Sequence, residues 1–235
     1  MKKLQKQRFD KILELLKISD YLKYSDLEKQ MNVSAITIRR DVIKMETLGL
    51  LNRISGGIEN KSISQDIDYN LRSKKNLSAK KAVAKKASKY IKNNLIIFLD
   101  AGTTIFELIP YLKGKNITAI TNCIEHINKL IKNEINFILL GGYVKPSTKA
   151  TVGIETLNQL DKFNFDIAFI GANGVDKEKG ITTPDIEEAH IKTKAIKHSK
   201  KVYILTDSSK FNKISNVKFS EYDNVNIITE KGEIN

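Results

Sequence analysis

The sequence predicts an α/β protein made of an N-terminal winged helix-turn-helix and a C-terminal doubly wound, mostly parallel α/β domain. Two observations predict this division. The first 58 residues carry helical spacing of apolar side chains followed by one glycine-centred hairpin. The later residues alternate short apolar runs with amphipathic stretches, as parallel strands and crossover helices do. We expect the winged helix over residues 1–58, a linker over 59–76 and the α/β domain over 77–235.

Helical periodicity begins near the N-terminus. Residues 6–18 place their apolar side chains on one face and predict a first helix. Ser25 followed three residues later by Glu28 matches a capping box, which predicts a short second helix. Ser34 is a favourable N-cap for a longer third helix over residues 35–48.

A hairpin follows the third helix. Gly49 is expected to end that helix, residues 50–54 to form a strand, and residues 55–57 to turn into a return strand from Ile58. The order of short helix, turn, longer helix and hairpin is that of a winged helix, in which the second helix of the pair enters the major groove of DNA. The buried stripe expected on this helix is Ile38, Val42, Met45 and Leu48.

Positive charge is concentrated in the first 92 residues. Residues 1–60 hold 12 basic and 8 acidic side chains, and residues 61–92 hold 10 and 2, whereas residues 93–235 hold 18 and 17. Lysines scattered over solvated faces would be spread evenly instead. A polyanion such as nucleic acid is therefore the expected partner of the first part of the chain.

The candidate DNA contacts are the side chains left outside the buried stripe of the third helix, together with the hairpin. Arginine reads guanine edges or binds phosphates, and serine and threonine hydroxyls suit both roles. Asp41 and Lys44 lie further round the helix and suit intramolecular pairs. The alternative that Arg39 and Arg40 are ordinary solvated arginines stays open. The candidates are Ser34, Ala35, Thr37, Arg39, Arg40, Arg53 and Gly56.

The second half opens with a basic helix. Ser78 is expected to cap a helix reaching about Asn93, and its lysines are expected to form a solvated face. The strands expected after it are residues 95–99, 117–120, 137–140, 167–170, 202–205 and 225–228. The helices expected between them are residues 104–113, 123–133, 154–163 and 186–199.

Small and polar clusters fall at the carboxyl ends of these strands, the edge at which open α/β sheets bind ligands. The helix beginning at Gly102–Thr104 offers free amide groups and hydroxyls to an anion. No lysine follows in the P-loop manner and no GxGxxG turn is present, so a small anion fits better than a nucleotide. Lys192 and Lys210 are candidates for positive charge. The candidates for sugar hydroxyls, each of which also suits a local cap or turn, are Asp100, Asn122, Asn173, Asp185 and Glu188.

These residues together resemble the DeoR family of bacterial sugar-metabolism regulators over nearly the whole chain. Residues 33–41 resemble its recognition helix and residues 53–58 its wing, in which Ser55 and Ile58 stand where His and Ala are usual. The later motifs that resemble the family are residues 100–104, 121–122, 140–142, 169–174, 180–185, 188–189, Lys192 and residues 207–211.

The resemblance implies a fold related to ribose-5-phosphate isomerase and a sugar-phosphate effector that relieves repression of a phosphotransferase-type operon. The Thr-Thr-Pro-Asp form at residues 182–185 resembles members that respond to fructose phosphates. The effector-site residues that it implies are Asp100, Gly102, Thr103, Thr104, Thr121, Asn122, Gly141, Gly142, Gly171, Asn173, Gly174, Thr182, Thr183, Asp185, Glu188, Lys192 and Lys210.

An alternative is a sugar-phosphate isomerase-like enzyme that carries a DNA-binding tether. Asp100, Glu188 and Lys192 are acid or base candidates by type, but no catalytic motif accompanies them, so we expect no enzyme activity. The three histidines are far apart in sequence, and we expect no metal and no cofactor. The single Cys123 and the lack of a long apolar run predict a cytoplasmic protein. Symmetric DNA half-sites predict a homodimer or homotetramer.

Overall fold

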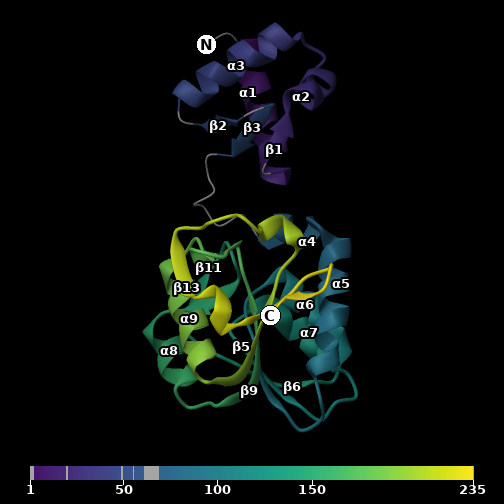
Figure 1. The fold of residues 1–235 in the computed structure, drawn as a ribbon, viewed down its shortest axis with the longest axis vertical. Helices are drawn as coiled ribbons and strands as arrows, with labels where there is room; N and C mark the ends of the chain where they lie inside the picture. Colours follow the sequence, from purple (N-terminus) through teal and green to yellow (C-terminus); the bar gives the residue numbers. More distant parts are fainter. Residues whose placement is uncertain (1–2, 20, 49, 55, 61–68, 235) are drawn as a thin grey trace. The chain divides into compact units, whose positions relative to one another are not determined.

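The computed structural model describes residues 3–19, 21–48, 50–54, 56–60 and 69–234. The chain divides into two compact units, Met1–Gln65 and Asp66–Asn235, and each is described by itself (Figure 1). Three sequence predictions, the helix end at Gly49, the turn residue Ser55 and the central part of the linker at residues 61–68, lie outside the described residues.

The first unit packs helices against a small antiparallel sheet with strand order β1-β3-β2. The third helix, the turn before it and the hairpin were predicted, whereas the short strand β1 was not, because three residues carry too little pattern. The elements are α1 (Lys3–Ile18), β1 (Tyr21–Lys23), α2 (Tyr24–Met31), α3 (Ala35–Thr47), β2 (Leu51–Ile54) and β3 (Gly57–Asn60). The core of this unit includes Ile12, Leu16, Leu27, Ile38, Val42, Met45, Leu51 and Ile58.

The caps of these helices confirm one prediction and overturn another. Ser34 caps α3, and its hydroxyl accepts a hydrogen bond from the Thr37 amide at 3.4 Å. The capping box predicted at Ser25 is wrong. Helix α2 begins at Tyr24, so Ser25 lies inside the helix and Lys23 is its N-cap. Leu48 is also misassigned, because α3 ends before it and the side chain is 56% exposed.

The hairpin depends on a glycine at a close approach between strands. Gly57 pairs with Lys23 of β1, and a Cβ atom built on it would lie 2.2 Å from the Leu22 carbonyl oxygen. No side chain fits in that space. Gly56, at the tip, has a φ of +81°, which favours glycine. Both glycines of the predicted turn are therefore required by the backbone.

The second unit is built on a seven-stranded sheet with the order β15-β14-β12-β9-β4-β5-β6, parallel except for β15. All six predicted strands lie in it, which confirms the doubly wound, mostly parallel class. The strands are β4 (Ile96–Leu99), β5 (Thr118–Thr121), β6 (Asn136–Leu139), β9 (Phe165–Gly171), β12 (Ser199–Leu205), β14 (Asn226–Ile228) and β15 (Glu233–Ile234).

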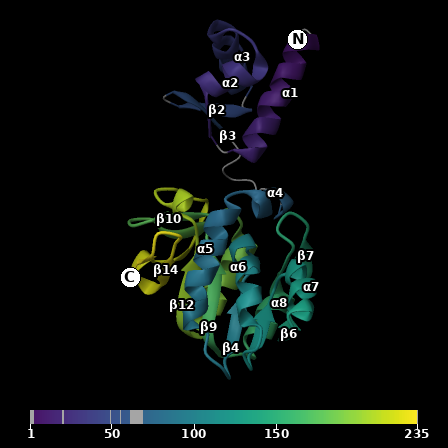
Figure 2. The same cartoon turned by 90° about the vertical axis from the view of Figure 1, so that its right-hand side faces the viewer.

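Helices cover both faces of this sheet, with α8 and α9 on one side and α5, α6 and α7 on the other (Figures 1 and 2). Successive residues of β4 show the two faces, because Phe98 packs into one core cluster while Ile97 and Leu99 pack into the other. The helices are α4 (Tyr69–Lys74), α5 (Leu77–Ala87), α6 (Thr103–Leu108), α7 (Ile127–Lys132), α8 (Ile154–Leu160) and α9 (Ile186–Lys197).

Two small antiparallel sheets complete the unit, and the sequence predicted neither of them. Each is made of strands of three or four residues, which are too short for a clear alternation. They are formed by β7 (Tyr143–Lys145) with β8 (Ala150–Val152), and by β10 (Gly174–Asp176), β11 (Gly180–Thr183) and β13 (Val217–Ser220).

The segment between the units contains more regular structure than the sequence indicated. Glu59 and Asn60 belong to β3, and Tyr69–Lys74 forms α4, so both ends of the segment predicted as a linker are ordered elements. The predicted cap at Ser78 is wrong, because α5 begins at Leu77 and its N-cap is Asn76, whose φ is 53°.

Candidate functional site

The outward face of α3 carries the predicted DNA-contacting residues of the first unit. Arg39 and Arg40 are exposed, and the Arg39 guanidinium carbon lies 6.0 Å from the centroid of the Tyr24 ring. The hydroxyls of Ser34 and Thr37 lie 3.0 Å apart at the start of the helix. Ala35, between them, is half-buried. These side chains therefore share the N-terminal half of α3.

Sequence reasoning missed Ile36 on the same turn. Its side chain is 80% exposed, the largest exposed fraction among the large apolar residues of the described chain. An apolar side chain at the start of a recognition helix suits contact with a thymine methyl group. The sequence signal that could have identified Ile36 is its position outside the predicted buried stripe.

Two charged residues of this unit form intramolecular pairs. Asp41 is fully buried and accepts hydrogen bonds from Arg8 at 2.6 Å and from the Gln5 amide at 2.9 Å, which joins α3 to α1. Arg53, predicted to contact DNA from the hairpin, is paired with Glu46 at 2.6 Å. Since its side chain remains 43% exposed, the pair leaves part of Arg53 accessible.

The second unit holds a basic pocket at the carboxyl ends of three neighbouring strands, β4, β9 and β12. It is open at its mouth, and its empty space is about 680 Å³ when the open solvent there is counted. Nine predicted effector residues line it: Asp100, Gly102, Thr103, Thr104, Gly171, Asn173, Glu188, Lys192 and Lys210.

A buried ion pair forms one wall of this pocket. The Lys192 ammonium donates to Asp100 Oδ2 and, at 3.2 Å, to the Gly171 carbonyl oxygen. Asp100 Oδ2 also accepts the Gly171 amide at 2.9 Å. Lys192 and Asp100 are 3% and 2% exposed. The positive charge of Lys192 is therefore largely matched by Asp100, and the pair joins α9 to the ends of β4 and β9.

A second wall of the pocket comes from α4, α5 and the residues between them, which were predicted to be linker and solvated helix. Arg72, Lys75, Asn76 and Lys80 all line the pocket. Lys80 is only 6% exposed, and burial lowers its pKa to about 8. The prediction of a wholly solvated basic face on this helix is therefore wrong at Lys80.

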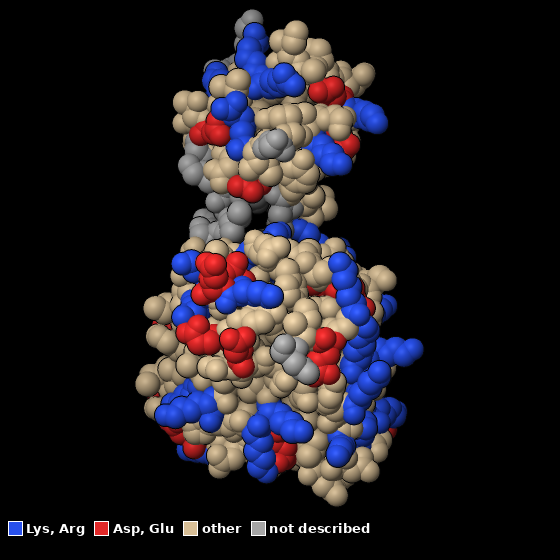
Figure 3. Space-filling model, in the orientation of Figure 1, with Lys and Arg blue, Asp and Glu red and all other residues tan. Residues whose placement is uncertain are grey.

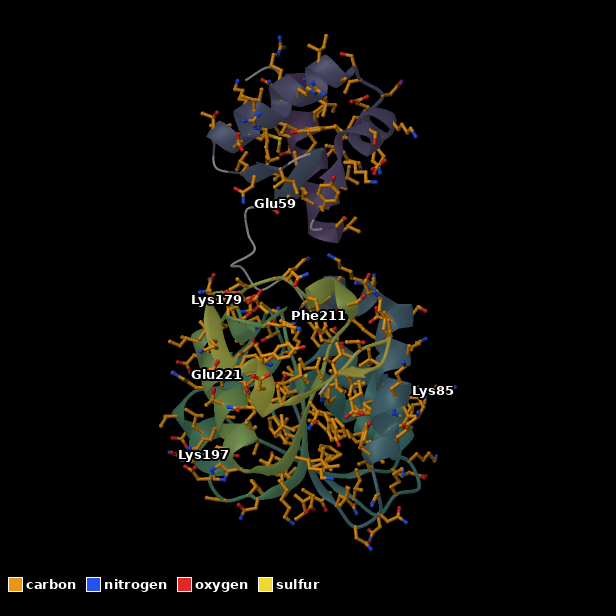
Figure 4. All side chains as sticks on the ribbon, viewed as in Figure 1. Glu59, Lys85, Lys179, Lys197, Phe211 and Glu221 are labelled. Atoms are coloured by element: carbon orange, nitrogen blue, oxygen red, sulfur yellow. The ribbon has the colours of Figure 1, made fainter. Side chains whose placement is uncertain are left out.

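The other lysines of α5 do form a solvated face. Figure 3 shows basic side chains in a column along the side of the second unit on which α5 lies. Lys81 and Lys85 are exposed, and Figure 4 shows Lys85 on the outer side of its helix. Lys80 and Lys85 thus belong to the same helix but to different environments, which a repeated Lys-Lys pattern does not distinguish.

The remaining predicted effector residues have structural partners and do not line the pocket. Asp185 caps α9 by accepting the Glu188 amide, and pairs with Lys145 at 2.7 Å, which contributes to a lowered pKa of its carboxyl. Thr182 accepts the Ser215 amide at 2.9 Å. Those outside the pocket lining are Thr121, Asn122, Gly141, Gly142, Gly174, Thr182, Thr183 and Asp185.

Two of the small and polar clusters predicted at strand ends, residues 121–122 and 141–142, therefore stay apart from the pocket. Thr121 donates to the Leu99 carbonyl oxygen at 2.7 Å, and Asn122 donates to the Thr151 carbonyl oxygen at 3.2 Å. Gly141 and Gly142 follow β6, the edge strand, and pack against α8. All these strand ends lie on one edge of the sheet, but the pocket spans only β4, β9 and β12.

His126 and Cys123 are buried near the strand end of β5. Full burial lowers the pKa of His126 to about 4, and burial raises the pKa of the Cys123 thiol to about 12. Cys123 therefore packs as an apolar group in the core. His190 is exposed and does not line the pocket. Within the described ranges, no group of three His, Cys, Asp or Glu side chains has the arrangement of a metal site.

Both halves of the chain match models of one protein family. Residues 8–64 match the DeoR-like helix-turn-helix domain, and residues 75–231 match the DeoR C terminal sensor domain. The chain belongs to the DeoR family. The resemblance seen in the sequence is thereby confirmed, and the family's helix-turn-helix corresponds to the unit that carries α3.

Relatives of this DeoR-family chain are transcriptional regulators. It is 41% identical to the uncharacterised HTH-type transcriptional regulator FruR of Bacillus subtilis, over 98% of this chain and 92% of that protein. It is 32% identical to the lactose phosphotransferase system repressor of Staphylococcus epidermidis, over 97% of this chain and 92% of the repressor. The regulator GlpR of Haloferax volcanii is 31% identical, over 98% and 91%.

One solved structure shares the fold at low sequence identity, and a second is similar over part of the chain. The translation initiation factor eIF-2B of Pyrococcus horikoshii is 16% identical, with a TM-score of 0.53 over 98% of this chain and 90% of that one. Ribose 5-phosphate isomerase A of Methanocaldococcus jannaschii is 22% identical, with a TM-score of 0.43 over 58% and 55%. None of the helices in the described ranges has the length and apolar character required to cross a membrane.

Proposed function

We propose that this DeoR-family chain is a DNA-binding repressor of a sugar-utilisation operon and that a sugar phosphate controls it from the pocket of the second unit. The observation that carries the proposal is the charge of that pocket. Five basic and three acidic side chains line it, an excess of two positive charges. A phosphate monoester carries about −1.5 to −2 charges at neutral pH, which matches this excess.

The polar groups around the pocket suit the rest of such a ligand. Asn173 and Glu188 offer amide and carboxylate groups to sugar hydroxyls, and Thr103 and Thr104 add hydroxyls at the start of α6. A relative named as the lactose phosphotransferase system repressor supports sugars as the class. We propose fructose phosphates as the first compounds to test.

DNA binding is proposed for α3 and the hairpin of the first unit. The residues are those predicted from the sequence, Ser34, Ala35, Thr37, Arg39, Arg40, Arg53 and Gly56. Because helix-turn-helix regulators bind paired half-sites, we propose a homodimer or homotetramer that works in the cytoplasm. We propose that the DNA-binding domain, expected over residues 1–58, extends at least to the end of β3 at Asn60, and that residues 77–235 form the core of the effector domain, to which α4 contributes.

We propose that the pocket binds its ligand without turning it over. A catalytic base must be within reach of the proton it removes, but Lys192 is held by Asp100 and the Gly171 carbonyl oxygen. Incubation of the pure protein with phosphorylated aldoses and ketoses tests this proposal, and no isomerised product is expected. Steady product formation at a rate proportional to protein concentration would favour the isomerase-like alternative.

Two measurements on the full chain test the regulator proposal. A mobility-shift titration with promoter fragments from the protein's own locus is expected to show binding at nanomolar protein that competitor DNA does not remove. Thermal unfolding with fructose 1-phosphate, fructose 6-phosphate or glucose 6-phosphate is expected to show a raised melting temperature with at least one, because a ligand that binds only the folded state stabilises it. Absence of both effects would overturn the proposal.

A further inference from the structure

The wall of the pocket formed by α4 and α5 contains buried hydrogen-bond donors that have no partner in the part of the chain that the structure describes. The Nε and Nη2 atoms of Arg72 are buried and have no hydrogen-bond partner among the described residues. The Thr206 hydroxyl, at the end of β12, is also buried and has no partner among the described residues. Both Arg72 and Thr206 line the pocket. Buried polar groups normally have partners, so unpaired donors and hydroxyls on one cavity indicate a polar ligand.

Lys80 strengthens this wall. Its ammonium donates to the Arg72 carbonyl oxygen, so the end of its side chain lies beside α4. Asn76, between the two helices, donates to Asp207 at 3.1 Å and so ties this segment to the end of β12. The wall therefore combines a guanidinium, an ammonium and a hydroxyl over a short stretch of the cavity.

The wall that contains the Lys192–Asp100 pair is less available to an anion. Lys192 is already paired with Asp100, and Glu188 adds a second carboxylate near it. An anionic group would be repelled by these carboxylates and attracted to the side of the pocket where cations are in excess. The two walls therefore differ in charge, and this difference determines which end of a sugar phosphate would lie at each wall.

We propose that Arg72 and Lys80, with the Thr206 hydroxyl, bind the phosphate of the effector, while the sugar lies toward Asp100, Glu188 and Lys192. This inference rests on the proposed function and assigns the phosphate to residues of α4 and α5 rather than to Lys192. A guanidinium with two unpaired donors suits a phosphate, which accepts two parallel hydrogen bonds.

The assignment also provides a route for regulation. Helix α4 is the first described element of the second unit, which directly follows the first unit in sequence. A phosphate bound to Arg72 and Thr206 would tie α4 to the end of β12, so the pocket's occupancy would determine how firmly the start of the second unit is held. Ligand binding would therefore act on the chain segment that leads to the DNA-binding unit.

The test is calorimetric titration of the full-length protein with the three sugar phosphates named above and with fructose and gluconate as controls. Arg72→Gln and Lys80→Met are expected to weaken binding of the phosphorylated sugar at least tenfold, as loss of a charged hydrogen bond implies. Lys85→Met, on the exposed face of the same helix, is the matched control and is expected to bind within twofold of the wild type.

A second variant and a second readout separate binding from folding. Arg72→Lys keeps the charge but loses the paired donors, and is expected to show a smaller loss than Arg72→Gln. Hydrogen exchange at residues 69–76 is expected to slow on ligand addition in the wild type and to stay unchanged in Arg72→Gln. Melting temperatures without ligand identify any variant that fails to fold, in which case Arg72→Lys decides.

The outcomes distinguish the two proposals. If the wild type binds none of the phosphorylated sugars, the sugar-phosphate part of the proposed function is overturned and this inference with it. If the wild type binds one of them and both Arg72→Gln and Lys80→Met bind it equally well, the phosphate lies elsewhere in the pocket and only this inference is overturned. Equal affinity for gluconate or fructose would show that the pocket does not select a phosphate.

Discussion

Lys192 of α9 and Asp100 at the end of β4 form a buried ion pair, and the same carboxylate oxygen accepts the Gly171 amide at 2.9 Å. One carboxylate thus fixes the geometry of two neighbouring strand ends and of a helix. Residues of this kind are recognised in a sequence as ligand-binding candidates, but their first role here is to build the wall of the pocket.

Removing the cation of this pair is expected to destabilise the second unit. Lys192→Met leaves a buried carboxylate without its cation, which costs about 3–5 kcal/mol in unfolding free energy. Denaturant unfolding measures this loss of unfolding free energy. The double variant that combines Lys192→Met with Asp100→Asn is expected to recover part of the loss. Lys194→Met on the same helix breaks an exposed pair with Asp161 and should change the unfolding free energy little, because exposed ion pairs contribute little. Equal losses in both single variants would contradict this account.

The pair of Asp41 and Arg8 has a parallel role in the first unit. Arg8→Met is expected to lower the unfolding free energy of that unit by about 3 kcal/mol, because the fully buried Asp41 keeps only the Gln5 amide as a partner. Lys11→Met, which breaks an exposed pair with Glu14 in the same helix, is the control and should change little. Unfolding followed by circular dichroism in the helical region reports both variants.

We expect Arg39 and Arg40 to contribute to DNA binding rather than to the stability of the fold. Arg39→Gln and Arg40→Gln remove exposed charges from α3, so each should weaken operator binding more than tenfold while the melting temperature stays within about two degrees. Loss of a phosphate contact should also reduce the slope of log affinity against log salt by about 0.9. An operator affinity equal to that of the wild type in both variants would refute the recognition role of α3.

The pKa of Lys80 predicts a specific pH dependence of ligand affinity. Burial is the main cause that lowers this pKa to about 8; Arg72 and Lys210 lower it further, while Asp207 and Glu107 oppose the shift. Above pH 8 the unliganded protein carries a neutral Lys80, and binding a phosphate dianion must then take up a proton. Because the second pKa of a phosphate monoester is about 6, affinity should be highest between about pH 6 and 8 and fall above pH 8.

Calorimetry in buffers with different ionisation enthalpies measures this proton uptake directly. At pH 8.5 the wild type is expected to take up a fraction of a proton on binding, and Lys80→Met is expected to take up less. An affinity that is constant from pH 7 to pH 9.5 in the wild type would show that Lys80 does not face the bound phosphate.

The sheet could be predicted from the sequence because strands buried on both faces appear as continuous apolar runs. Val202–Leu205 and Ile167–Ile170 are such runs, and both lie centrally in the sheet. The small strands β7, β8, β10 and β11 could not be predicted, since each has only three or four residues and depends on its partner strand rather than on local pattern.

The pocket could be predicted only in part. The principle that open α/β sheets bind ligands at the carboxyl ends of their strands identified Asp100, the residues after Gly102 and the Gly171 cluster. The same principle applied equally to Thr121 and Gly141. Only the strand order shows which strand ends enclose a cavity. Arg72 was missed because a six-residue helix has too little periodicity. Lys80 has the same neighbours in sequence as an exposed lysine, so its burial depends on the packing of α4 against the rest of the unit.

The most direct test of the central claim is the coupling between effector and operator. Fluorescence anisotropy of a labelled operator fragment would be measured against protein concentration, with and without a saturating sugar phosphate identified by thermal unfolding. The account predicts that operator affinity falls at least fivefold with the phosphorylated sugar and stays unchanged with the free sugar, and that the operator weakens sugar-phosphate binding by the same factor. Operator affinity that no phosphorylated sugar alters, in a protein that binds one, would contradict it.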